Sequence, residues 1–132
     1  MKQRIVAVFG AALLILVTAS AAAAAAPKSA FTGTWVSTDT DGSVQLLKVS
    51  GGTTPSVLYQ DFYASVCANN GSRTVHWTAA GTGIVDGDAL FASFKTSGCG
   101  SFSIGAYDSP WFYDGATDTL TDPYDVTWYR VP

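Results

Sequence analysis

One acidic residue stands in the middle of a predicted strand, between two tyrosines. Asp61 alternates with Tyr59 and Tyr63, so the three side chains are expected on the same face of the strand. A carboxylate at such a position needs a polar partner or solvent, because burying it alone is unfavourable. One interpretation of Asp61 is an orienting group inside a ligand cavity. The alternatives are an exposed strand face, or a buried pair with Arg73 or Arg130.

The only histidine, His76, is the residue on which a nucleophile–histidine–acid triad would depend, since serines and aspartates are plentiful. The sequence contains no Gly-x-Ser-x-Gly nucleophile elbow, however. Paired carboxylates for glycoside chemistry would have to be aspartates, and most of these fall in turn-like segments. We therefore predict no enzymatic activity and no catalytic residues, with a hydrolase as the third alternative.

Two groups of aspartates raise the question of a metal site. Asp39 and Asp41 resemble the start of a calcium-binding loop, but such a loop needs a downstream bidentate acid, and the sequence has no glutamate. Asp114, Asp118 and Asp122 recur at every fourth position, a spacing that also suits aspartates capping turns. We expect turn caps in both groups, and neither a metal ion nor any other cofactor.

The amino-terminal segment, residues 1–25, has the organisation of a signal peptide. Lys2 and Arg4 form a basic start, and residues 5–17 are an apolar run too short for a membrane span. An alanine tract follows and supplies small residues for cleavage, which we place after Ala25. The protein is therefore predicted to be secreted, either extracellular or periplasmic, and an uncleaved anchor is the alternative.

The remaining residues, 26–132, are enough for one domain and show no internal repeat or linker. They carry ten aspartates against five lysines and arginines, a net charge of −5 with the histidine neutral. This balance argues against nucleic acid, whose phosphates need a basic stripe, and against docking on anionic lipid. We expect no membrane insertion once the signal peptide is removed. The sequence carries no signal for an oligomeric state.

The two cysteines, Cys67 and Cys99, predict one disulfide, because an even number of cysteines in an exported protein is typical of bridges. The bridge would close a loop of about 33 residues and stabilise the fold by about 3.5 kcal/mol on the chain-entropy model. The alternatives are two free thiols or a metal pair, and a metal would need ligands beyond His76.

Short runs of β-branched and aromatic residues, separated by turn residues, make up the rest of the chain. Asp41-Gly42 and Asp86-Gly87 supply the positive φ that tight hairpins require. The runs predict strands at 34–38, 43–50, 56–66, 73–80, 89–96, 101–107, 110–113 and 125–131, with a further short strand at 119–121. This pattern predicts an all-β fold, a small antiparallel eight-stranded up-and-down barrel, with a β-sandwich as the alternative.

Alternation along the strands is imperfect, and both faces carry apolar side chains. Such a pattern fits a semi-polar barrel interior, or an outer face that meets a partner. If the interior holds a cavity, we expect its lining to include Tyr59, Asp61, Trp77, Phe94, Trp111 and Phe112.

Residues 31–35, Phe-Thr-Gly-Thr-Trp, open the first strand, and residues 128–130, Trp-Tyr-Arg, close the last. These two ends of the chain resemble those of lipocalin-like and avidin-like barrels, which form the calycin type. In those families the tryptophan of a Gly-x-Trp motif packs against an arginine from the final strand. The resemblance implies that Trp35 and Arg130 close one end of a barrel in which the first and last strands are neighbours.

Residues 26–132 also resemble a family of small exported bacterial proteins of unknown function. The shared features are Trp35, Asp41-Gly42-Ser43, Tyr59-x-Asp61, Cys67, Cys99, and the stretch that begins at Tyr113-Asp114 and ends in Trp128-x-Arg130. This resemblance implies no activity.

Two functions follow as hypotheses. The first is non-catalytic binding of a small apolar or aromatic ligand, for which an eight-stranded barrel has room. The second is a structural or protein-interaction domain at the cell surface, whose barrel is filled by its own side chains. An open interior lined by the aromatic residues favours the first, and a filled interior with apolar patches outside, for example at residues 111–113, favours the second.

Overall fold

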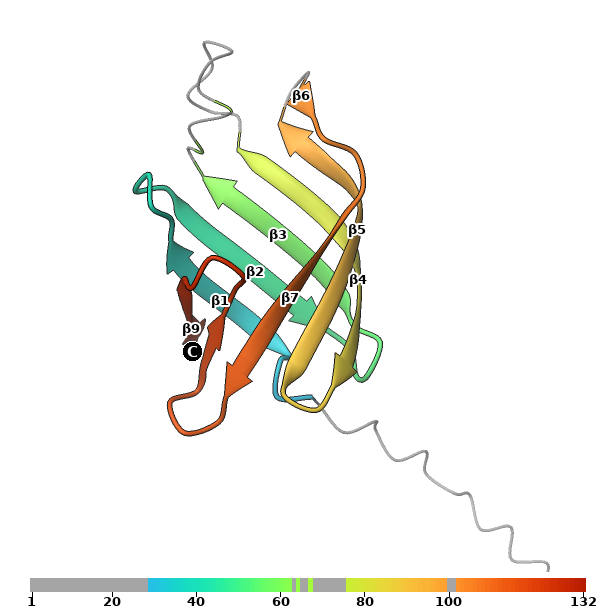
Figure 1. Cartoon of the computed structure of the whole chain (residues 1–132), viewed down its shortest axis with the longest axis vertical. Coiled ribbons are helices and arrows are strands. Elements are labelled where there is room, and N and C mark those ends of the chain that lie inside the picture. The colour runs from blue at the N-terminus through green and yellow to red at the C-terminus, as the bar shows by residue number, and fades with distance from the viewer. Residues whose placement is uncertain (1–28, 63, 65–66, 68–75, 100–101) are drawn as a thin grey trace, which may run out of the picture.

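Eight antiparallel strands form a closed ring in the computed structural model, which describes residues 29–62, 64, 67, 76–99 and 102–132. The strands of the ring are β1 (Gly33–Thr38), β2 (Val44–Ser50), β3 (Ser56–Phe62), β4 (Trp77–Asp86), β5 (Ala89–Cys99), β7 (Tyr107–Asp114), β8 (Thr119–Thr121) and β9 (Thr127–Val131). Each pairs with the next along the chain, and β9 pairs with β1 to close the ring (Figure 1). The up-and-down barrel predicted from the sequence is confirmed.

The carboxy-terminal half differs from the predicted strands around Pro110. Separate strands were expected at 101–107 and 110–113, but β7 runs through Pro110, and β6 (Phe102–Ser103) is a short pairing with the end of β5. A proline lacks the N–H of a strand ladder and is tolerated best at a strand edge. Since β8 pairs only with the lower end of β7, from Phe112 onward, β5 is the one neighbour of Pro110 among the described strands.

β4 continues through two glycines to Asp86, whereas the strand predicted at 73–80 stops before them. A Cβ at Gly81 would collide with the backbone carbonyl of Ser93, and a Cβ at Gly83 would collide with the side chain of Leu90. These glycines therefore allow close approach between β4 and β5 and do not form a turn.

A β-bulge in β5 changes which of its residues face inward. The pairing of β4 with β5 shifts between Ala80 and Gly81, and Lys95 is the residue left without a partner. Lys95 and Thr96 are both exposed as a result, and the buried positions resume at Ser97.

Large apolar side chains fill the end of the barrel at which β1 begins. The fully buried members of this core include Phe31, Trp35, Leu47, Val49, Val57, Leu90, Phe94, Leu120 and Trp128. Burying each side chain of this size contributes about 1.5–3 kcal/mol relative to leaving it in water. This half of the barrel is therefore a packed core, and it supports the residues at the other end.

The predicted disulfide between Cys67 and Cys99 is present and joins the segment after β3 to the end of β5, with a Cα–Cα distance of 5.9 Å. Both cysteines are buried, in a second small cluster with Ala64 and Trp77. The bridge thus restrains the barrel at the end opposite the main core.

Several predicted features lie outside the described residues, namely the signal segment at residues 1–25 and two suggested neighbours of Asp61, Tyr63 and Arg73. Within the described ranges, no helix has the length and apolar character needed to cross a membrane.

Candidate functional site

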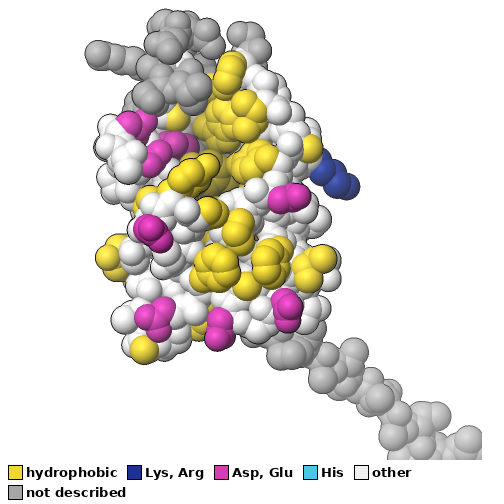
Figure 2. Space-filling view, viewed as in Figure 1, with side chains coloured by type: hydrophobic (Ala, Val, Ile, Leu, Met, Phe, Trp, Pro, Cys, Tyr) yellow, Lys and Arg dark blue, Asp and Glu magenta, His cyan; other side chains and the backbone are white. Residues whose placement is uncertain are grey.

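A cavity of about 610 Å3 lies at the end of the barrel opposite the main core. Its walls include residues of β2, β3, β4, β6, β7 and β9, and seven aromatic residues line it: Tyr59, Trp77, Phe102, Tyr107, Trp111, Tyr124 and Trp128. The space-filling view shows the hollow as an apolar area bordered by acidic side chains (Figure 2). Among the described residues, the barrel interior is therefore filled at one end and contains a cavity at the other, which we call the open end.

The cavity also reaches the wall of the barrel where β8 is short. β8 pairs with β7 only from Phe112 to Asp114, so the upper part of β7 faces the turn at residues 122–126 without a strand between them. Residues on both sides of this break, Ser109 on β7 and Tyr124 in the turn, line the cavity. At this side of the barrel the cavity is therefore bounded by the turn and not by a strand.

One wall of the cavity is polar and lies on β2 and β3. Gln45 and Asp61 are direct partners across these two strands. Gln45 Nε2 donates a hydrogen bond to the Tyr59 hydroxyl (3.0 Å), and this hydroxyl lies 3.5 Å from Asp61 Oδ2. The remaining oxygens, Gln45 Oε1 and Asp61 Oδ1, are buried and have no hydrogen-bond partner among the described residues. Buried acceptors in this state are unfavourable unless a bound group satisfies them.

The environment of Asp61 disfavours its charged form. Burial raises the pKa of Asp61, and the nearby carboxylates of Asp39 and Asp41 raise it further. The side chains of Ser43 and Gln45 act in the opposite direction, although Ser43 Oγ itself lacks a well-oriented partner among the described residues.

The hydroxyl beside Asp61 stays protonated. Burial raises the pKa of Tyr59 far above its ordinary value, and the charge of Asp61 adds to the rise. Tyr59 is therefore a hydrogen-bond donor at any physiological pH, and its acceptor site is already used by Gln45.

The position of Asp61 tests two of the alternatives for its role. The side chain is 6% exposed, which contradicts a solvent-exposed strand face. A pair with Arg130 is also contradicted, because Arg130 is bound to Asp118 at the closed end of the barrel. The suggested pair with Arg73 lies outside the described residues. Asp61 lies in the wall of the cavity, as its interpretation as a cavity residue requires.

The opposite wall presents an indole N–H without a partner. Trp111 on β7 is 3% exposed, and its Nε1 has no hydrogen-bond acceptor among the described residues. Its ring makes edge-to-face contacts with Phe94 (6.0 Å) and Trp128 (6.3 Å). The ring is thus held in place, and its free donor is part of the cavity wall.

Asp122 fixes the turn that precedes β9, and β9 carries Trp128, the third tryptophan of the cavity. Its Oδ1 accepts hydrogen bonds from the backbone N–H groups of Tyr124 (2.9 Å) and Val126 (3.0 Å). Its Oδ2 accepts a hydrogen bond from Trp128 Nε1 (3.2 Å), and Trp128 packs against Tyr59. This is the turn-capping role expected for Asp122, and it also positions a ring of the site.

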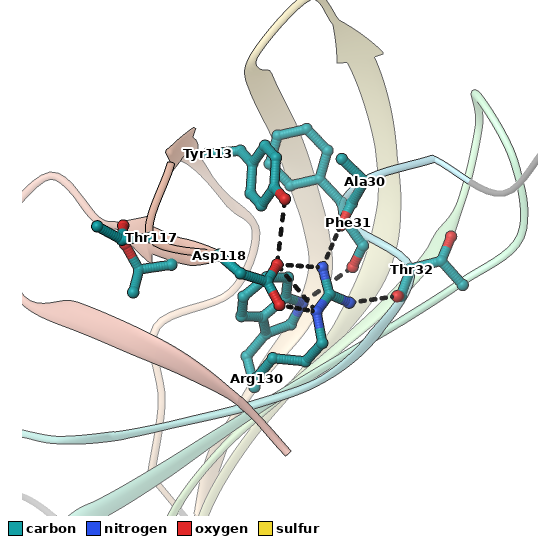
Figure 3. A network of polar contacts seen from close by, with 9 residues as sticks. Ala30, Phe31, Thr32, Tyr113, Thr117, Asp118 and Arg130 are labelled. Carbon is teal, nitrogen blue, oxygen red and sulfur yellow. Dashed lines mark hydrogen bonds and ion pairs between the residues drawn. The ribbon is translucent and has the colours of Figure 1, made fainter. Parts of the chain in front are cut away.

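The closed end of the barrel is organised by Arg130, whose guanidinium lies 4.0 Å from the centre of the Trp35 ring. The guanidinium donates hydrogen bonds to the carbonyls of Thr32 (2.8 Å) and Ala30 (2.7 Å) and forms an ion pair with Asp118 (2.8 Å) (Figure 3). The structure therefore brings together the residues that the lipocalin-like motif implied, and they lie away from the cavity.

Two predicted cavity residues lie elsewhere. Phe112 is 49% exposed on the outer face, because the inward positions of β7 are the odd-numbered ones, including Trp111. Phe94 is buried in the core and does not line the cavity, but its ring supports Tyr107 and Trp111. The other four, Tyr59, Asp61, Trp77 and Trp111, do line it.

Sequence reasoning missed twelve of the sixteen described lining residues. Among these are Trp128, Gln45 and Tyr107, and the first two had a signal in the sequence. Trp128 shares a strand face with Arg130, and Gln45 shares one with Leu47 in a half-buried strand, so both inward orientations follow from alternation. Tyr107 had no such signal, since it was placed at the end of a strand that the structure divides differently.

The only histidine does not face the cavity. His76 contacts Gln60, with a nitrogen–nitrogen distance of 3.2 Å, and stacks near Phe62, both of which point outward from β3. A hydrolase would need a polar cluster around this residue inside a cleft. Among the residues that the structure describes, no group of three or more histidines, cysteines or acidic residues is arranged to hold a metal ion.

Comparison of the chain with protein-family models, with curated proteins and with solved structures finds no match in any of the three.

Proposed function

We propose that this protein is a secreted, non-catalytic barrel of the calycin type that binds one small apolar or aromatic molecule at its open end. The observation that carries the proposal is the cavity of about 610 Å3, walled by aromatic rings and containing buried polar atoms without partners among the described residues. Small-molecule sites have volumes of roughly 300–1,000 Å3 and combine apolar walls with a few polar groups that orient the ligand.

The side chains of the site are also held in place by other residues. This favours the interpretation of the cavity as a binding site and not as a gap left by imperfect packing. Trp128 is held by Asp122, Tyr59 by Gln45, and Trp77 packs beside the buried disulfide. Side chains that are fixed before the ligand arrives lose little conformational entropy on binding.

Secretion has two supports of its own. Residues 1–25 have the organisation of a signal peptide, and disulfides such as Cys67–Cys99 persist in oxidising compartments outside the cytoplasm. The closed barrel and the contact of Arg130 with Trp35 are consistent with the calycin type and with the resemblance to small exported bacterial proteins.

The test is binding of a neutral apolar dye, N-phenyl-1-naphthylamine, by the secreted protein. Trp111 faces the cavity and Phe112, the next residue, faces out, so Trp111→Ala and Phe112→Ala form a matched pair. We expect Trp111→Ala to weaken dye binding by about tenfold and Phe112→Ala to leave it unchanged. Trp111→Phe keeps a ring in place if the alanine variant does not fold. Dye binding that depends on Phe112 and not on Trp111 would overturn the proposal.

A second candidate function is contact with another protein through the outer face. Ile84 and Phe91 are partners across β4 and β5, Phe91 is opposite Pro110 across β5 and β7, and Phe112 follows on the same face. Ile84, Phe91 and Phe112 are 64%, 49% and 49% exposed, an apolar row on a monomer surface. Sedimentation at rising protein concentration, compared with Phe91→Ser, tests self-association. A monomer at every concentration would argue against it.

A further inference from the structure

The unpartnered acceptors of the cavity are concentrated on one wall. Asp61 Oδ1 and Gln45 Oε1 belong to cross-strand partners, and both side chains are more than nine-tenths buried. Neither oxygen accepts a well-oriented hydrogen bond from the described residues, although the Ser43 and Gln45 side chains lie close to the Asp61 carboxyl. A ligand that satisfies both must bring at least two N–H or O–H groups to this wall, and an ammonium group carries three donors on one atom.

The charge of the cavity also selects for a cation. The described lining includes four aspartates, Asp39, Asp61, Asp108 and Asp122, and it contains no lysine, arginine or histidine. Acidic side chains lie on two sides of the apolar hollow in the space-filling view (Figure 2). A carboxylate or phosphate ligand would be repelled at this site, whereas a cation is attracted before any direct contact forms.

The aromatic walls are compatible with the same cation. Tyr59, adjacent to Asp61 on its strand face, and Trp128, packed on Tyr59, stand next to the acidic wall. Trp77 and Trp111 complete the enclosure. Aromatic faces attract cations and also pack against an apolar body, so one enclosure accommodates both parts of an amphiphilic ligand.

We propose that the ligand is a protonated organic amine with an aromatic or apolar body, its ammonium group bound to Asp61 and Gln45. This inference rests on the proposed function and specifies its ligand class. Alkyl amines are protonated at neutral pH, so the bound ion would pair with the Asp61 carboxylate and leave the apolar body among the tryptophans.

The experiment compares three probes with the same phenyl body and different heads, namely 2-phenylethylamine, 2-phenylethanol and 3-phenylpropionate. Titration calorimetry and tryptophan fluorescence on the secreted protein give the dissociation constants. We expect the amine to bind about tenfold more tightly than the alcohol, and the carboxylate to bind most weakly.

Asp61→Asn keeps the shape of the side chain and removes its charge. We expect this variant to lose about tenfold in affinity for the amine and to bind the alcohol within about twofold of the wild type. Asp88→Asn, which removes a charge from an exposed residue outside the cavity lining, is the matched control and should leave the affinity for the amine unchanged.

The outcomes separate this inference from the proposed function. If the alcohol binds as tightly as the amine, or if Asp61→Asn leaves amine affinity unchanged, the amine proposal is overturned, while binding of N-phenyl-1-naphthylamine at Trp111 still supports a ligand-binding barrel. An unchanged affinity would also be the result if Arg73 or another group of the chain holds the carboxylate. If neither the dye nor any of the three probes binds, both proposals fail.

Discussion

Arg130 lies over the ring of Trp35, with its guanidinium 4.0 Å from the ring centre, and the two residues come from strands at opposite ends of the chain. The contact occupies the end of the barrel away from Asp61 and the cavity. The molecule is therefore divided into a closed end, where charge and aromatic contacts hold the strands together, and an open end, where similar groups lack partners among the described residues.

Replacing Arg130 tests the role of the closed end. Arg130→Ala removes the hydrogen bonds to the carbonyls of Ala30 and Thr32 and the ion pair with Asp118. We expect urea denaturation to show a loss of about 2 kcal/mol or more in the free energy of unfolding. Dye affinity at the open end should stay close to that of the folded wild type. Asp118→Asn, which removes only the ion pair of a partly exposed side chain, should have a smaller effect, and the opposite order would contradict this account.

Gly81 provides a test of the close approach between β4 and β5. A Cβ at this position would overlap the backbone carbonyl of Ser93. Because the overlapping atoms belong to the backbone, they cannot move aside as the end of a flexible side chain could. We expect Gly81→Ala to lower the free energy of unfolding by about 3 kcal/mol. Gly115 is the matched control, because a Cβ there meets only the Tyr113 ring at 3.5 Å, and Gly115→Ala should change stability by less than about 0.5 kcal/mol. Equal melting temperatures for the two variants would show that β4 relaxes without penalty.

The sequence predicted the barrel well because its hydrophobic alternation and turn residues are local signals. Tyr59 and Asp61 were assigned correctly to one strand face, and Asp122 to a turn. The errors arose where a non-local contact overrode a local signal. β7 continues through Pro110 because β8 does not pair with β7 at this residue, so no N–H is needed on that side. β4 continues through Gly81 because the backbone of β5 lies close against this residue.

The site was harder to predict than the fold for a similar reason. The open end exists because the strands beside it differ in length, and strand length depends on pairing that a sequence does not state. The bulge at Lys95 illustrates this, since it changes the inward face of β5 halfway along the strand. Phe112 was wrongly placed in the cavity because the sequence did not show which residues of β7 face inward.

Reduction of the disulfide should affect stability and the open end together. The bridge between Cys67 and Cys99 packs against Trp77, a wall of the cavity. We expect the double variant Cys67→Ser with Cys99→Ser to lose about 3.5 kcal/mol in the free energy of unfolding. Dye titration at a temperature where both proteins are folded should show weaker binding by the variant. Wild-type protein treated with a reductant serves as the control. If neither the double variant nor the reduced wild type binds the dye more weakly than the untreated wild type, the disulfide does not support the cavity.

The raised pKa of Asp61 predicts how the stability of the ligand-free protein depends on pH. Below its ordinary value of 3.8 the carboxyl is protonated in both the folded and the unfolded state, so its burial carries no charge penalty. As the pH rises above 3.8, the carboxyl ionises in the unfolded chain before it ionises in the folded state, so the native state loses stability until the pH has passed the raised pKa. At neutral pH the raised pKa of Asp61 therefore makes the ligand-free protein less stable than it is in acid, unless a cation is bound.

Asp61→Asn isolates this effect, because the variant side chain cannot ionise. We expect the variant to melt at a higher temperature than the ligand-free wild type at pH 7, and the difference to disappear as the pH approaches 3.8. The exposed carboxyls of Asp114 and Asp118, whose pKa values are lowered by hydrogen bonds, act in the opposite direction, but they do so equally in both proteins and cancel in the comparison. Thermal melts across this pH range measure the difference. A wild type that is the more stable protein at pH 7 would mean that the carboxylate has a partner within the chain, which would also remove the basis for its role in binding a cation.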